Sequence, residues 1–345
     1  MKRKAFDAEL CRLNAPVSKD VFSHWATNTR GWEILHDEEA FSKWDVVIRK
    51  QDGSIIPIEL ETREDDAIRK IRNHVLRMTG RMREVIGHEE WGTIHILGRK
   101  IEKSESELFV AFNVSYTTMF VLKMDYARKF PLIVMNTSMK DDEELADVPI
   151  FEEEDGVMVQ RVKMIDVPES SHPVRLGWRR VMMGWERAEY EVVNGDILDS
   201  EAQCIAHQCN CLTRTSSGVA RQIFSRFPNS DIYSGREAPN EPGHIVIKRD
   251  GGKIIINMLS QFEPGGPGGE MDSEDDRRRY FESCLDEIPM IEGLSSVAFP
   301  FRIGCGLAGG DWEGVYEPML NDFAKRMKAR GIRTLVHVLS SEGNL

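Results

Sequence analysis

The chain has 345 residues, of which 41% are hydrophobic and 30% are charged. This composition is typical of a globular protein, and the length favours two domains because a single hydrophobic core rarely serves so many residues. No apolar run approaches the roughly 20 residues of a membrane span, and the six cysteines come without a signal peptide, so we predict an intracellular, soluble protein with no membrane partner. The net charge of −12 argues against a general nucleic-acid coating role.

The N-terminal half predicts a β-hairpin followed by further strands. WDVVIRK (44–50) is a strand, QDGS is a turn, and IIPIELETR (55–63) is the returning strand. Asp45 opens the first strand, and Glu59 and Glu61 share one face of the second because side chains alternate along a strand. The segments GTIHILG, ELFVAFN and PLIVMNT are expected to extend the sheet of an N-terminal α/β domain.

These carboxylates resemble the motif of PD-(D/E)XK nucleases, in which an Asp and an ExK pair on adjacent strands hold Mg²⁺ for phosphodiester cleavage. The resemblance is partial, since Glu61 stands at the lysine position. It implies a restriction-endonuclease-like domain with Asp45, Glu59 and Glu61 as metal ligands, Mg²⁺ as cofactor and DNA or RNA as partner. The alternative is an edge hairpin whose charged residues face water and prevent aggregation.

A change of composition divides the chain. The acidic segment 139–156 is followed by a basic, tryptophan-containing segment at 169–190. We therefore predict an α/β domain over 1–168, a linker over 169–187 and a second domain over 188–345.

Strands and helices alternate in the second domain. Strands are predicted at 190–194, 203–207, 244–248, 253–259, 295–300 and 333–339, and helices near 217–226, 275–287 and 313–330. Such alternation predicts an α/β sheet with helices on its faces and ligands beyond the carboxyl ends of its strands.

The segment IAHQCNC (205–211) places His207 and Asn210 at the end of such a strand. Zinc would need three or four His or Cys ligands, and CNC has neither the usual spacing nor a second pair. A cysteine nucleophile would need a base that the sequence does not identify. Cys209 and Cys211 are therefore interpreted as small apolar residues of a strand end.

Two loops have the residues expected around a diphosphate. TSSGVARQI (215–223) puts small residues where a helix begins, and backbone N–H groups at a helix N-terminus bind anions. RIGCGLAGG (302–310) follows a strand and can approach a ligand closely because glycine has no Cβ. Facing each other, the two loops would form a diphosphate cleft.

Segments 194–233, 254–265 and 299–312 resemble, in this order, the motifs of macro domains. The similarity is greatest to the branch that contains ADP-ribose 1''-phosphate phosphatases and terminal ADP-ribose hydrolases, and it covers about residues 188 to 342. It implies a three-layer α/β/α domain with a mixed sheet. No cofactor is implied for this domain. The implied partner is ADP-ribose or an ADP-ribosylated protein or nucleic acid.

The resemblance also implies which residues bind ADP-ribose. Asp196, beside Ile197, would accept a hydrogen bond from the adenine amino group, and Asn210 would contact the distal ribose. The two phosphates would lie at Ser216, Ser217, Gly218, Val219 and Ala220, and at Ile303, Gly304, Cys305, Gly306, Leu307 and Ala308. From the residues alone, Asp196 could instead cap a turn, and Asn210 could stabilise its own loop.

The chain departs from the lysine-dependent hydrolases of this branch. Their lysine corresponds to Ser260 and their loop aspartate to Ala308, whereas the phosphatases carry a histidine like His207. A histidine near its usual pKa of ~6.5 can act as nucleophile or general acid, and Asp311 could orient it. The predicted activity is removal of phosphate from ADP-ribose 1''-phosphate, or of an ADP-ribosyl group from a macromolecule. The alternatives are a non-catalytic reader of ADP-ribosylated partners and a His207 that is a hydrogen-bonded core residue.

Overall fold

The computed structural model describes residues 8–35, 44–63, 93–97, 105–113, 116–124, 132–136, 150–154, 157–161, 165–181 and 184–339. The chain divides into two compact units. One comprises Met1–Trp178 and Met182–Glu186, and the other Arg179–Val181 and Arg187–Leu345.

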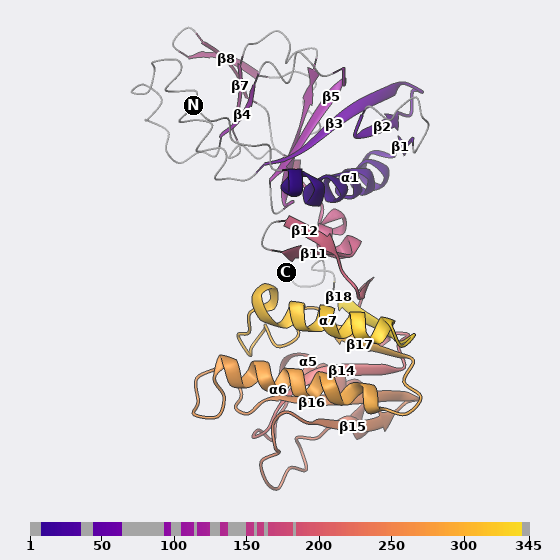
Figure 1. Ribbon diagram of the computed structural model, residues 1–345, viewed down its shortest axis with the longest axis vertical. Helices are drawn as coiled ribbons and strands as arrows, with labels where there is room; N and C mark the ends of the chain where they lie inside the picture. Colours follow the sequence, from indigo (N-terminus) through magenta and orange to yellow (C-terminus); the bar gives the residue numbers. More distant parts are fainter. Residues whose placement is uncertain are drawn as a thin grey trace. The chain divides into compact units, whose positions relative to one another are not determined.

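The N-terminal unit is built on a six-stranded sheet with the order β1-β2-β3-β5-β6-β10, against which α1 (Ala8–Arg30) packs (Figure 1). Its strands are β1 (Glu33–Ile34), β2 (Val46–Arg49), β3 (Ile55–Arg63), β5 (Leu108–Asn113), β6 (Thr118–Lys123) and β10 (Ile165–Asp166). Strands β3 and β5 are parallel, and the other neighbours are antiparallel. The core between helix and sheet includes Val21, Trp25, Ile48, Ile58 and Val110.

The predicted hairpin is confirmed as β2 and β3, with Val46 opposite Ile58 and the turn closed by Lys50 and Ser54. Two of the later strands differ from the prediction. Strands β4 (Thr93–Leu97) and β7 (Leu132–Asn136) pair with each other in a separate two-stranded sheet and do not extend the first. Strands β8 (Ile150–Glu154) and β9 (Val157–Arg161) form another antiparallel pair.

The segment expected to be a linker, 169–187, is folded. It contains the 3-10 helices η3 (Glu169–Ser171) and η4 (Pro173–Leu176) and the paired strands β11 (Trp178–Val181) and β12 (Gly184–Arg187). Trp178 and Trp185 are buried in the core of the N-terminal unit, and Trp178 donates its Nε1 hydrogen to Asp20 Oδ2 (3.0 Å). Tryptophan buries a large apolar area, which explains why this segment folds against a core instead of remaining a linker.

The C-terminal unit is a mixed six-stranded sheet with the order β13-β18-β17-β14-β16-β15. Its strands are β13 (Glu191–Asn194), β14 (Cys204–Asn210), β15 (Ile245–Asp250), β16 (Lys253–Gln261), β17 (Ser296–Pro300) and β18 (Arg333–Val338). All neighbours are parallel except β15, which runs antiparallel to β16. The six strands predicted for this half of the chain are confirmed.

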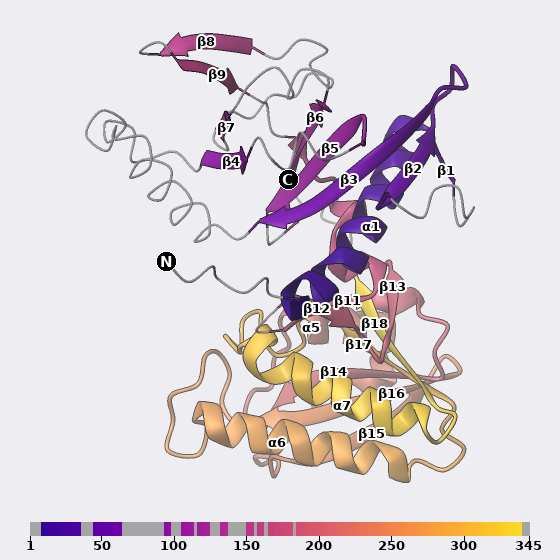
Figure 2. The same cartoon turned by 45° about the horizontal axis from the view of Figure 1, so that its top comes forward.

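Helices cover both faces of this sheet, giving three layers (Figures 1 and 2). Helices α6 (Glu274–Glu287) and α7 (Glu317–Lys328) pack on one face, where Phe281 and Phe323 meet Ile256. Helix α5 (Gly218–Arg226) packs on the other, where Phe224 meets Ile255. Adjacent residues of β16 thus serve opposite cores because strand side chains alternate. The remaining short helices are η5 (Ile197–Asp199), η6 (Pro228–Ser230), η7 (Ile288–Met290) and the π-helical turn η8 (Trp312–Tyr316).

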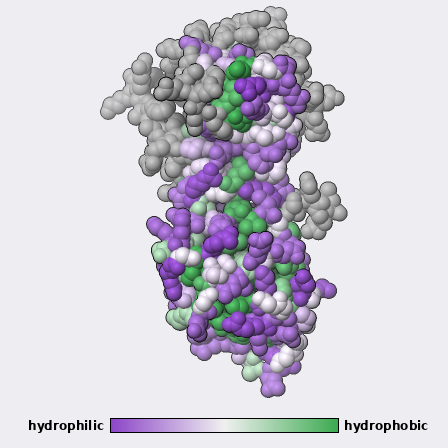
Figure 3. All heavy atoms as spheres, turned by 90° about the vertical axis from the view of Figure 1, so that its right-hand side faces the viewer, coloured by the Kyte–Doolittle hydropathy of each residue, from purple (hydrophilic) through white to green (hydrophobic). Residues whose placement is uncertain are grey.

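Hydrophilic residues dominate the visible face of the C-terminal unit, and apolar areas on it are small (Figure 3). Within the part of the chain that the structure describes, no helix combines the length and apolarity required to cross a bilayer.

Candidate anion-binding site

Three of the motif-bearing segments lie at one edge of the C-terminal sheet. Strands β13, β14 and β17 all run parallel within the sheet, so their carboxyl ends point the same way. Strand β13 leads into η5, β14 into the loop before α5, and β17 into the loop 301–311. This edge is where open α/β sheets usually bind ligands.

The first turn of α5 is not capped by a side chain. Its N-cap residue, Ser217, has an extended backbone (φ −140°, ψ 166°) and makes no side-chain cap hydrogen bond. Among the described residues, the backbone N–H groups of Ser216, Ser217 and Gly218 find no acceptor. Unpaired N–H groups together with the helix dipole make this helix end attractive to an anion.

The loop 301–311, called the second loop below, presents N–H groups of the same kind. A turn closes where Gly309 N–H donates to Gly306 O (3.0 Å), and within the described structure the N–H groups of Leu307 and Ala308 form no hydrogen bond. Leu307 is 73% exposed, and its Cδ1 lies 3.6 Å from the position that a Cβ on Gly218 would occupy. The tip of this loop and the first turn of α5 are therefore neighbours.

Gly304 allows the backbone of the second loop to pack directly against Gln208 and Tyr316. Its φ of +77° is unfavourable for other residues, and a Cβ there would lie 2.5 Å from Gln208 Oε1 and 2.8 Å from Tyr316 Cε1. Gly310 N–H donates to Gly304 O (3.0 Å) and closes the base of the loop. Glycine is required here because the backbone touches its neighbours directly.

Asp196 lies two residues after the end of β13 and caps η5. Its Oδ1 accepts a hydrogen bond from Leu198 N (2.9 Å), as the turn-capping interpretation predicted. Its Oδ2 has no hydrogen-bond partner among the described residues, and the side chain is half-buried. Leu198 and Gly218 line one open groove of about 670 Å³, which places η5 beside the start of α5.

Asn210 stabilises the loop that follows it. The side chain is buried, its Oδ1 accepts from Leu212 N (3.0 Å) and Thr213 N (2.8 Å), and its Nδ2 donates to Tyr233 Oη (3.1 Å). These contacts match the loop-stabilising interpretation, and the expected contact with a distal ribose stays a prediction.

His207 lies in the core between β14 and α5. It is 1% exposed, its ring packs edge-on against Phe224 with centroids 5.3 Å apart, and its Nε2 lies 2.8 Å from Asn257 Oδ1. Asn257 Nδ2 donates to Val246 O (3.1 Å), so Asn257 Oδ1 must be the acceptor and the imidazole carries its proton on Nε2.

Burial lowers the pKa of His207 from 6.5 to about 4, and the hydrogen bond with Asn257 only partly opposes this shift. The ring is therefore neutral at pH 7. At 1% exposure and with Nε2 bonded to Asn257, the imidazole has the surroundings of a core residue, and its role as nucleophile or general acid stays a prediction. These surroundings match the alternative interpretation of His207 as a hydrogen-bonded core residue.

Asp311 does not join His207. It is exposed, precedes η8 and accepts from Gly314 N at its Oδ1 (3.0 Å). The partners of His207 are Asn257 and Cys209. The predicted catalytic pair is consequently not assembled, because each side chain is committed to its own element.

Other predicted residues at these strand ends belong to the core. Burial raises the pKa of Cys211 to about 12 and raises the pKa of Cys209 further, so neither is a thiolate at neutral pH. Ser260, at the lysine position of the hydrolases, is fully buried. Besides Asn210, three apolar side chains from the predicted ADP-ribose set are buried, so these residues offer a ligand only their backbone: Ile197, Ala220 and Ile303.

The predicted metal ligands of the N-terminal unit lie on the hairpin. Asp45 precedes β2, and its Oδ2 accepts from Leu60 N of β3 (2.7 Å). Glu59 lies on β3, half-buried, and the side chain of Glu61 is outside the described residues. No group of three His, Cys, Asp or Glu residues suited to a metal occurs among the side chains that the structure describes. Metal binding at this hairpin stays a prediction.

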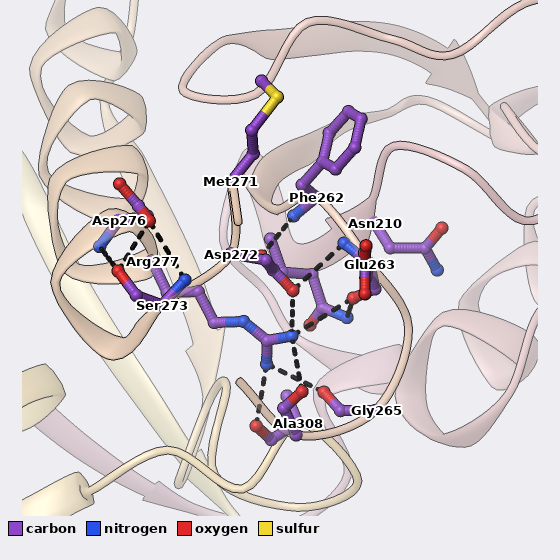
Figure 4. Close-up of polar contacts among 12 residues, drawn as sticks. Asn210, Phe262, Glu263, Gly265, Met271, Asp272, Ser273, Asp276, Arg277 and Ala308 are labelled. Carbon is purple, nitrogen blue, oxygen red and sulfur yellow. Dashed lines mark hydrogen bonds and ion pairs between the residues drawn. The ribbon is translucent and has the colours of Figure 1, made fainter. Parts of the chain in front are cut away.

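Sequence reasoning missed one buried ion pair beside the second loop. Arg277, in the first turn of α6, is paired with Asp272, and both are buried (Figure 4). Both residues stand in the charged segment EMDSEDDRRR, whose pattern indicates an exposed helix start. Nothing in that pattern distinguishes the one inward-facing arginine from its neighbours.

Models of known protein families give no match to the chain. An "Uncharacterized 17.5 kDa protein in tk-vs intergenic region" of Enterobacteria phage T4 is 26% identical over 151 residues, covering 39% of this chain and 90% of the phage protein. Three solved structures are similar to 44% of the chain. They are "Alphavirus P23pro-zbd" (20% identity, TM-score 0.33, 22% of that chain), the macrodomain of Mycobacterium tuberculosis DarG (20%, 0.34, 99%) and the Trypanosoma brucei macrodomain in complex with ADP-ribose (16%, 0.31, 64%). The chain thus spans about a fifth of the alphavirus protein.

Proposed function

We propose that the C-terminal unit is a macro domain that binds ADP-ribose. The proposal rests on two neighbouring groups of backbone N–H donors that find no acceptor among the described residues. One group lies at the start of α5 and the other in the turn at 306–309, and the two segments are close where Leu307 lies beside Gly218. Backbone N–H groups are good partners for phosphate oxygens, and two neighbouring sets suit two linked phosphates.

Other features of the same edge favour a nucleotide over a simple anion. Arg214 and Arg302 are exposed in the two loops and add local positive charge to a protein of net charge −12. The half-buried Asp196 offers an acceptor, Oδ2, to the amino group of a nucleobase. Charge at the loops and an acceptor at η5 together match a purine diphosphate.

Binding is better supported than catalysis. The residues predicted to act on a phosphate, His207 and Asp311, are a core residue and a helix cap. A reader that recruits the N-terminal unit to ADP-ribosylated proteins or nucleic acids is therefore the leading form of the proposal. Hydrolysis of ADP-ribose 1''-phosphate or of an ADP-ribosyl linkage is the second form, and it would use groups other than His207.

A charge placed at the mouth of the site tests the binding proposal. In calorimetry, the full chain should bind ADP-ribose, and Leu307→Asp should weaken binding by about tenfold or more because a carboxylate would face the ligand phosphates. Met290→Asp, at a position 79% exposed on η7, is the matched control and should bind like the unmodified chain. Absence of ADP-ribose binding by the unmodified chain would remove the proposal.

Turnover separates the reader from the hydrolase. The chain is incubated with ADP-ribose 1''-phosphate, mono-ADP-ribosylated protein, and ADP-ribosylated DNA or RNA, and the products are read by mass spectrometry. Intact substrates combined with measurable ADP-ribose binding identify a reader. Product formation that survives His207→Gln identifies a hydrolase that does not use this histidine.

For the N-terminal unit we propose a nuclease-like role at the β2–β3 hairpin, supported by the carboxylates of Asp45, directly before β2, and of Glu59 on the neighbouring strand β3. Mg²⁺ or Mn²⁺ should then support cleavage of DNA or RNA, and Asp45→Asn should abolish it. Lack of cleavage of single- and double-stranded substrates with either metal would leave this unit as a binding or scaffold unit.

A further inference from the structure

Arg277 connects α6 to two loops at once (Figure 4). Its side chain is 2% exposed, and Nη1 donates to Gly265 O (2.8 Å) and to Ala308 O (2.9 Å). Nη2 donates to Gly266 O (3.1 Å) and pairs with Asp272. Gly265 and Gly266 belong to the loop after β16, whereas Ala308 belongs to the second anion-binding loop.

Asp272 completes the connection. The side chain is fully buried, and its two oxygens accept from Phe262 N (2.7 Å) and Glu263 N (3.1 Å). The carboxylate therefore fixes the beginning of the loop after β16, while its ion pair orients the Arg277 guanidinium. The two loops also lie close together, since a Cβ on Gly309 would lie 3.7 Å from Gly266 Cα.

A guanidinium is suited to this position because its donors are held in one plane and point in fixed directions. One guanidinium here bonds carbonyls from two loops and a carboxylate. An ammonium group has three donors at one point and cannot span the same set. Burying such an ion pair is a weak source of stability, so its use here is better explained by the geometry that it imposes.

We propose that Arg277 is a positioning residue for the anion site, which rests on the function proposed above. By holding the Ala308 carbonyl against α6, it fixes the turn at 306–309. The N–H groups of Leu307 and Ala308 then lie where they meet the first turn of α5 before any ligand arrives. A loop ordered in advance binds more tightly, because a ligand's apparent affinity falls with the fraction of molecules in the competent conformation.

Arg277→Lys tests this role, with Arg278→Lys as the matched control. Arg278 is the next residue of α6, and its side chain is half-exposed beside Asp275. Without ligand, hydrogen exchange read by mass spectrometry should become faster in 301–311 and 262–269 of Arg277→Lys and stay unchanged elsewhere. In calorimetry well below the melting temperature, its Kd for ADP-ribose should rise by about tenfold, as expected if about a tenth of the molecules keep the competent loop. Arg278→Lys should match the unmodified chain in both measurements.

Asp272→Asn, which keeps the shape of the carboxylate but not its charge, should show the same two effects and serves if Arg277→Lys does not fold. Unchanged exchange, or faster exchange with unchanged ADP-ribose affinity, would overturn the positioning role. An unmodified chain that does not bind ADP-ribose would overturn the proposed function instead, and the exchange measurement would still decide whether Arg277 orders the loop.

Discussion

The imidazole of His207 is most informative about stability. Its pKa is about 4 in the folded chain because burial disfavours the charged form, whereas the unfolded chain has the ordinary value of 6.5. Below pH 6.5 the unfolded state gains a proton that the folded state does not. The stabilisation is thus present above pH 6.5 and is lost as the pH falls towards 4.

We predict that this one group reduces the free energy of unfolding by roughly 3 kcal/mol between pH 6.5 and 4. Urea denaturation of the unmodified chain and of His207→Gln, which retains a donor for Asn257 Oδ1, isolates the effect. The difference in free energy of unfolding in favour of the unmodified chain should become smaller as the pH falls from 6.5 to 4. A constant difference between the two proteins would show that His207 does not titrate as its burial requires.

Asp196 has two tasks at the carboxyl end of β13. Its Oδ1 caps η5, and its Oδ2 is the acceptor assigned to a nucleobase amino group. Asp196→Ala should weaken ADP-ribose binding by about 1–3 kcal/mol in calorimetry because the base loses its acceptor. Asp199→Ala, at an exposed position of the same short helix, should bind as before. Equal effects of the two substitutions would refute the nucleobase contact.

The sequence identified the position of each candidate residue but not its surroundings. NGDI and RIGCGLAGG correctly marked strand ends, because glycine and small polar residues interrupt apolar runs. Whether a polar side chain at such an end faces the ligand or the core depends on its register relative to other strands. His207 faces α5 together with Ile205, and sequence spacing alone could not distinguish that core from the cleft.

At the scale of elements, the loop 301–311 depends on two particular glycines, Gly304 and Gly310, more than on its overall glycine content. A Cβ on Gly304 would collide with Gln208 and Tyr316 at a φ of +77°, whereas one on Gly306 would meet nothing within 4 Å. Gly304→Ala should therefore lower the free energy of unfolding by about 1–3 kcal/mol, as strained backbone positions do. Thermal unfolding with Gly306→Ala as control checks this, and equal melting temperatures would contradict it.

Strands and helices of the C-terminal unit were predictable because each apolar run has one period and a clear end. The buried pair of Asp272 and Arg277 was not predictable, since acidic and basic residues elsewhere in α6 form exposed pairs such as that of Arg278 and Asp275. Which of several adjacent arginines points inward is set by the packing of α6 on β16, a tertiary property.

At the scale of the whole molecule, the boundary between the two units runs through a folded segment. The composition change indicated a linker at 169–187, but Trp178 and Trp185 belong to the core of the N-terminal unit and Arg179 to the C-terminal unit. The division between the units thus falls inside β11, between Trp178 and Arg179, which explains why a change of composition could not locate the boundary. Each unit has its own hydrophobic core around its own sheet.

The boundary predicts which shortened chain is stable. Arg179 Nε lies 2.7 Å from both carboxylate oxygens of Glu317, which is 3% exposed at the start of α7, and Tyr190 Oη donates to the same carboxylate (3.1 Å). A segment that begins at residue 188 keeps Tyr190 but lacks the Arg179 partner of the buried carboxylate. Breaking a buried pair in this way costs about 3–5 kcal/mol, so the segment 179–345 should have a clearly higher melting temperature than the segment 188–345.

Glu317→Gln removes the charge that pairs with Arg179 and should reduce this difference in melting temperature. Glu313→Gln, at an exposed position of η8, should leave the difference unchanged. Equal melting temperatures of the two unmodified segments would mean that Arg179 is not part of the C-terminal unit.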